Sequence, residues 1–109
     1  MSRYSLSHLA ADELLRDLTA LIAKDRATTA ELLAHLAEAD SRQLFVPLGY
    51  PTMFAYCVGK LGFSEDVAFK RIRSARVARK FPDVFGAVAE GRLHVAALVL
   101  PHRTYWRRA

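Results

Sequence analysis

The sequence predicts an all-α protein that folds as a single helical domain over residues 1–109. The chain is short and 52% hydrophobic, which suits one small domain with a modest core. Apolar residues recur at intervals of three and four, which is the period of a helix face. No apolar–polar alternation bounded by turn residues competes, and only residues 95–100 fit a strand as well as a helix.

The first predicted element covers residues 7–40 and is either one long helix or two helices. Ser7 fits an N-cap, and Asp12 and Glu13 follow where negative charge suits the helix dipole. One unbroken helix would be about 50 Å long at ~1.5 Å per residue, which is too long for so small a domain to cover. It would therefore project from the domain or pair with another chain.

A break near residues 26–28 is the alternative. A charged triplet at residues 24–26 interrupts the apolar pattern of the segment. Thr28 and Glu31 have the spacing of a capping box, which would start a second helix.

A helix-turn-helix-like pair is predicted over residues 52–80. The preceding connector, residues 41–51, contains two prolines and a glycine and is unsuited to a regular helix. The pair consists of a helix over 52–61, a tight turn over 62–64 and a second helix over 65–80. The turn offers a glycine for a left-handed C-cap and a serine for an N-cap.

The sequence of the C-terminal part predicts two short helices over residues 82–100, separated at Gly91, and a basic tail over residues 101–109. Aromatic residues follow the apolar faces of the predicted helices, so we assign them to the core: Phe45, Tyr50, Phe54, Tyr56, Phe63, Phe69, Phe81 and Phe85.

Charge is distributed unevenly along the chain, whose net charge is +5. Residues 1–55 carry five basic and seven acidic side chains, whereas residues 56–109 carry eleven basic and four acidic ones. Such asymmetry indicates that the second half meets a polyanion. Nucleic acid is the commonest polyanion for a small domain, and anionic lipid is the other candidate.

The second helix of the predicted pair carries the candidate nucleic-acid-binding residues: Lys70, Arg71, Arg73, Arg76, Arg79 and Lys80. Four of them share one side of the helix by their spacing and are the expected phosphate contacts, while Arg71 and Arg79 are secondary. Glu65 and Asp66 would repel phosphate at the start of this helix. We therefore expect contact from its middle and C-terminal half, with no sequence readout implied.

Several segments, in one order over roughly residues 9–102, also resemble a known family: LLAHLAE at 32–38, GYPTMFAYC at 49–57, LGFSED at 61–66, AFKRI at 68–72, AR at 75–76, KFP at 80–82 and EGRLH at 90–94. Together they resemble the N-terminal helical region that precedes the HNH nuclease module in bacterial HNH endonuclease proteins of the myxobacterial type. The resemblance implies DNA association and a downstream metal-dependent nuclease.

The chain departs from that family after Pro101 and His102, where residues 103–109 replace further helices and the nuclease. We expect a truncated or altered copy, or a stand-alone form. The resemblance implies that an HNH site needs a metal-binding histidine, a general-base histidine and usually an orienting asparagine. The sequence contains no asparagine and no matching module, so this chain is expected not to be an enzyme.

No catalytic, metal or cofactor site is predicted from the remaining residues. The histidines are far apart and lack ligand spacing: His8, His35, His94 and His102. Cys57, the single cysteine, is expected to be a buried, inert thiol and suits a cytoplasmic protein. No membrane span, secretion signal or small-molecule substrate is indicated.

The interpretation is therefore a non-catalytic DNA-associating module without cofactors. One alternative is a protein-interaction or homodimerisation module that acts through the long N-terminal helix. The second alternative is a part of a metal-dependent HNH endonuclease whose catalytic module is missing from this chain.

Overall fold

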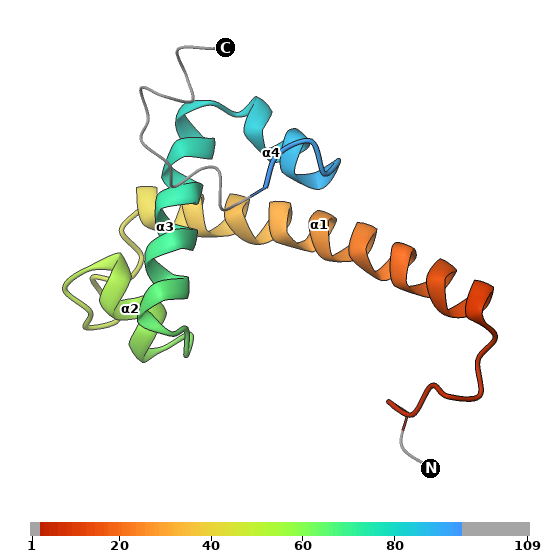
Figure 1. Ribbon diagram of the computed structural model, residues 1–109. Helices are drawn as coiled ribbons and strands as arrows, with labels where there is room; N and C mark the ends of the chain where they lie inside the picture. The colour runs from red at the N-terminus through yellow and green to blue at the C-terminus, as the bar shows by residue number, and fades with distance from the viewer. Residues whose placement is uncertain (1–2, 95–109) are drawn as a thin grey trace.

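The computed structural model describes residues 3–94, and within them it contains four α-helices and no strand (Figure 1). They are α1 (Ala11–Ser41), α2 (Met53–Gly59), α3 (Glu65–Lys80) and α4 (Asp83–Ala89). The predicted all-α class is therefore confirmed. The C-terminal half of α1 packs against α3 and α4, whereas its N-terminal half extends away from the other helices (Figure 1).

α1 is one continuous helix, so the alternative of a break near residues 26–28 is wrong. Residues 11–41 contain neither glycine nor proline, and alanines, which are strong helix formers, flank the charged triplet on both sides. The helix begins at Ala11 and not near Ser7, so Ser7 is not its N-cap. Ala10 takes the N-cap position, and no side-chain hydrogen bond caps the helix. The first turn contains both acidic residues expected there.

The two helices and the short turn expected over residues 52–80 are present as α2 and α3. The Thr52 hydroxyl accepts a hydrogen bond from the Ala55 amide at 3.0 Å, and the Ser64 hydroxyl accepts one from the Val67 amide at 3.2 Å. Gly62 has a φ of +75°, a left-handed conformation that favours glycine. α2 ends at Gly59, two residues earlier than predicted.

α4 corresponds to the first of the two short helices expected over residues 82–100. Pro82 occupies its N-cap, and the chain turns at Gly91 with a φ of +77°. Arg92–His94 are not helical, so the second short helix does not begin at residue 92 as expected. The rest of that helix, residues 95–100, and the basic tail, residues 101–109, lie outside the described residues.

The core forms where the C-terminal half of α1 meets α3 and α4, with α2 packed against α3. α3 contributes mainly small side chains, which lets the helices approach closely. Residues from all four helices are buried there: Ala30, Leu33, Leu36, Ala37, Met53, Cys57, Ala68, Ile72, Ala75, Val77, Ala78, Val84 and Val88. This packing fixes α3 against α1 and leaves the opposite side of α3 facing solvent.

Candidate nucleic-acid interface

The N-terminal half of α3 holds two of the six candidate cations by local contacts. The Lys70 ammonium lies 3.0 Å from the carboxylate of Asp66, one turn earlier in the same helix. The Arg71 guanidinium lies over the ring of Phe63, 4.9 Å from its centroid. Lys70 and Arg71 are therefore both engaged, one by the acidic first turn of α3 and the other by the turn that precedes the helix.

The C-terminal half of α3 meets carboxylates at the C-terminal end of α1. Arg76 donates two hydrogen bonds to Asp40, from Nε at 2.8 Å and from Nη2 at 3.0 Å. This paired geometry is the strongest arrangement open to an arginine and a carboxylate. It raises the pKa of Arg76 above its ordinary value, mainly through the hydrogen bond to Asp40.

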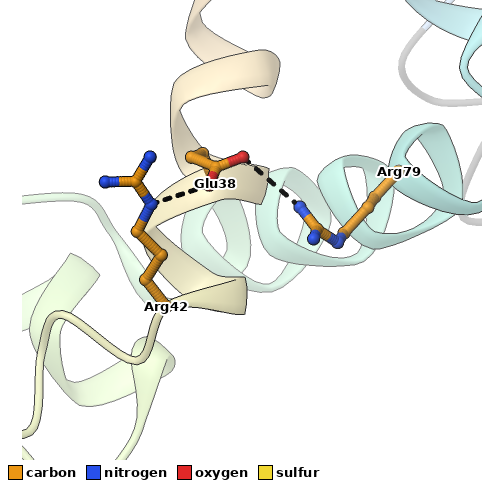
Figure 2. Close-up of polar contacts among 3 residues, drawn as sticks. All are labelled: Glu38, Arg42 and Arg79. Carbon is orange, nitrogen blue, oxygen red and sulfur yellow. Dashed lines mark hydrogen bonds and ion pairs between the residues drawn. The ribbon is translucent and has the colours of Figure 1, made fainter.

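Glu38 engages a second cation of α3. Its carboxylate accepts a hydrogen bond from Arg42 Nε at 2.7 Å and lies 3.6 Å from Arg79 Nη1 (Figure 2). The hydrogen bond and charge of Arg42, followed by the charge of Arg79, hold the pKa of Glu38 below its usual value. The acidic first half of the chain thus neutralises part of the basic second half within one molecule.

Arg73 and Lys80 differ from the other four cations. Both are exposed, and neither has a carboxylate within ion-pair distance among residues 3–94. They are seven residues apart, two turns along α3, and Arg76 lies between them on the same side. The six candidate cations therefore do not form one open surface, and the row Arg73–Arg76–Lys80 is the part that faces outward together.

This row borders a groove of about 470 Å³ between α3 and the start of α2. We call it the α3 groove. Its lining combines the three cations with apolar and aromatic side chains: Thr52, Met53, Phe54, Phe69, Ile72, Arg73, Arg76, Val77 and Lys80. The groove is therefore a basic rim around an apolar floor, open to solvent along one side of α3.

Two aromatic residues that the sequence assigned to the core line this groove instead. Phe69 is 55% exposed and Phe54 is 40% exposed, so their core assignment is wrong. The reason is position on the helix: Phe69 lies on the same side of α3 as Arg73 and Arg76, spaced from them by four and seven residues. That spacing was visible in the sequence and could have placed Phe69 beside the cations.

The ion pair between Arg76 and Asp40 is open to solvent on the arginine side, where 60% of the side chain is exposed. The Asp40 side chain is only 17% exposed, so the pair is partly buried, whereas fully exposed pairs contribute about 0–1 kcal/mol. We expect Asp40→Asn to free Arg76, strengthen duplex DNA binding several-fold and steepen its salt dependence by about one unit of slope. Fluorescence anisotropy of a labelled duplex measures both quantities. Glu31→Gln, an exposed change of equal charge elsewhere on α1, is the control and should change neither.

Cys57 is buried, as expected from the sequence. Burial is the main cause that raises the pKa of its thiol, and the negative charge of Asp40 adds to it. A thiol that stays protonated is a poor nucleophile, so Cys57 acts as a small apolar core residue.

Within residues 3–94 no group of histidine, cysteine, aspartate and glutamate side chains could hold a metal ion. His8, His35 and His94 are exposed, and His35 Nδ1 lies 2.7 Å from the carbonyl oxygen of Glu31 in its own helix. His102 lies outside the described residues. None of the helices in the described part of the chain is long and apolar enough to cross a bilayer.

Comparisons with known proteins return no match, whether with family models, curated proteins or solved structures. The resemblance to the region preceding an HNH nuclease module therefore rests on the quoted segments alone and stays a prediction.

Proposed function

We propose that the protein is a DNA-associating helical module that binds the phosphate backbone through the α3 groove without catalysing a reaction. The observation that carries the proposal is the row Arg73–Arg76–Lys80, which lies along the outer side of a helix fixed against the core. Two of its three members have no acidic partner within the described residues, so their charge is available to a polyanion.

The geometry of the row suits a chain of phosphates. Arg73 and Lys80 are about 10 Å apart along α3 at ~1.5 Å per residue, and both project from one rigid helix. Phosphate groups bind arginine and lysine by charge and hydrogen bonding, and the guanidinium fork suits two phosphate oxygens. Such contacts position a protein on nucleic acid and carry no sequence information, so the proposed binding is independent of sequence.

The exposed rings of Phe54 and Phe69 lie beside these cations in the same groove. A basic groove with accessible aromatic rings is also the composition that binds single strands, because unpaired bases stack on aromatic side chains. Binding is therefore measured with both duplex and single-stranded DNA, and we expect duplex DNA to be the stronger ligand.

The test is a salt titration of binding to a fluorescently labelled duplex of random sequence, followed by anisotropy. Two or three phosphate contacts predict that the logarithm of affinity falls with the logarithm of salt concentration with a slope of about −2 to −3. Four to six contacts, the number suggested by the sequence alone, would give a slope near −4 or steeper. Absence of binding at low salt would contradict the proposal.

A second candidate, a protein-interaction module, is favoured by one specific observation. The N-terminal half of α1 lies outside the core and exposes large apolar side chains, among them Leu15 at 61% and Leu21 at 62%. This surface is separate from the α3 groove, so the two functions are compatible and are tested independently.

A further inference from the structure

A continuous apolar surface runs along the N-terminal half of α1. It consists of five side chains that are each 40–62% exposed: Leu14, Leu15, Leu18, Leu21 and Ile22. We call it the leucine stripe. Nothing else in residues 3–94 buries it, and the helix carries it away from the core (Figure 1). Contiguous apolar surface of this kind marks an interaction site, whereas single exposed apolar residues do not.

The leucine stripe continues the face of α1 that packs in the core. Eighteen residues make five helical turns, so Leu15 and Leu18 lie on the same side of α1 as Leu33 and Leu36. Leu33 and Leu36 are buried against α3 and α4, with exposures of 0% and 4%. One side of α1 therefore carries apolar residues in both halves, interrupted at Asp25, and only the C-terminal group is covered within the described residues.

We propose that a second copy of this chain covers the leucine stripe, with the two α1 helices packed antiparallel. Residues 18 and 21 are then opposite each other, so that Leu18 of one copy meets Leu21 of the other in two symmetry-related layers. Leu15 of one copy lies beside Ile22 of the other in the same register. The spacing of three and four along the stripe is the pattern that packs two helices side by side.

Charge complementarity favours this antiparallel register. Asp17 and Lys24 are seven residues apart and lie on one flank of the leucine stripe. In an antiparallel pair the flank that carries Asp17 and Lys24 in one copy faces the same flank of the other copy, because the two-fold axis is perpendicular to both helices. The register that joins Leu18 to Leu21 therefore brings Asp17 of each copy beside Lys24 of the other, giving two complementary pairs.

A parallel pair would be opposed by the same residues. Asp25 lies in line with Leu14, Leu18 and Leu21 by its spacing, so in a parallel pair the two Asp25 carboxylates would face each other in the seam. In a parallel pair the folded cores of the two copies would also lie at the same end of the helix pair and would clash. In the antiparallel pair Asp25 lies at an edge, opposite Leu14, and the cores lie at opposite ends.

Sedimentation equilibrium of the full chain over roughly 10 to 300 µM tests the dimer, since an interface of about three helical turns belongs to the small, weak class. We expect a monomer–dimer equilibrium. Leu18→Glu should weaken the dimer by about 100-fold, because it places a carboxylate in both central layers. Leu18 is outside the core, so circular dichroism should show the helical content unchanged. A wild-type chain that is monomeric at all these concentrations would overturn the proposal.

Charge exchange tests the register. Lys24→Asp should weaken the dimer by about tenfold, because it replaces two complementary pairs with two repulsive ones. Adding Asp17→Lys to Lys24→Asp recreates both pairs and should restore the wild-type dissociation constant. Arg16→Asp, a similar change on the side of α1 away from the stripe, is the control and should leave dimerisation unchanged. Absence of rescue would overturn the proposed register.

Disulfide trapping tests the orientation. Leu14→Cys and Asp25→Cys are made as separate variants, since residues 14 and 25 are opposite each other in the proposed register. Under mild oxidation we expect a mixed disulfide only when the two variants are combined, with wild type as the control for Cys57. Efficient formation of a Leu14→Cys homodimer on its own would indicate parallel helices and would overturn the proposal.

Discussion

Replacing Arg73 and Lys80 together by alanine is expected to weaken duplex DNA binding about tenfold or more near 50 mM salt and to flatten its salt dependence by about two units of slope. Each lost phosphate contact removes about one unit, because one fewer counterion is released from the duplex. Both side chains are exposed and have no carboxylate partner within the described residues, so the substitution breaks no ion pair that supports the fold. The measurement is anisotropy of a labelled duplex at four or more salt concentrations.

A matched control removes the same number of charges elsewhere. Arg16 and Arg92 are exposed and lie away from the α3 groove, so changing both to alanine lowers the net charge equally. We expect this control to keep nearly the wild-type slope. Equal weakening by the two double variants would mean that net charge alone drives binding, and the α3 groove would then have no special role.

Replacing Leu33 by alanine is expected to cost about 2–5 kcal/mol of unfolding free energy. Leu33 is 0% exposed and comes from the part of α1 that packs against α3 and α4. Truncating it leaves a cavity at the junction of the three helices, which the small side chains of α3 cannot fill. Since small domains are stable by about 5–15 kcal/mol, this one change should remove a large part of the total.

Urea denaturation followed by circular dichroism measures this loss. Leu48→Ala is the matched control, because the same atoms are removed from a side chain that is 60% exposed. Its expected cost is below about 0.5 kcal/mol. A loss from Leu33→Ala as small as that of the control would contradict the assignment of the core to the junction of α1, α3 and α4.

Local sequence signals predicted the helices well where a cap or a glycine defines an end. Ser64 and Gly62 set the start of α3 and the turn before it, and both act through contacts within a few residues. The capping-box spacing of Thr28 and Glu31 suggested a break near residues 26–28, and this was wrong, because the strong helix propensity of the alanines on either side of the charged triplet keeps α1 continuous.

The state of the cations on α3 could not be predicted from local spacing. Arg76 meets Asp40 across thirty-six positions of sequence, and Arg79 meets Glu38 at similar separation. Only the packing of α3 across the end of α1 brings these groups together. The uneven charge of the two halves, which suggested an external polyanion, is thus partly satisfied inside the molecule.

The exposed aromatic rings show a different difficulty, which is the assignment of core residues from hydrophobicity alone. Phe69 shares a side of α3 with the cations, but its apolar character favoured a core position when the partners of the helix were unknown. Three of the six buried residues of α3 are alanines and a fourth is a serine, which gave a weak apolar signal in the sequence. Which side a helix buries depends on the shape of its neighbours as well as on hydrophobicity.

Phosphate binding by Arg73, Arg76 and Lys80 is tested residue by residue with side-chain NMR of the ¹⁵N-labelled protein during titration with a short duplex at low salt. We expect the Nε–Hε signal of Arg73 and the ammonium signal of Lys80 to shift first and furthest, with Arg76 following as it exchanges Asp40 for phosphate. The signals of Arg16 and Arg42 should stay in place. Shifts confined to residues outside α3, with Arg73 and Lys80 unchanged at saturation, would contradict phosphate binding by these residues.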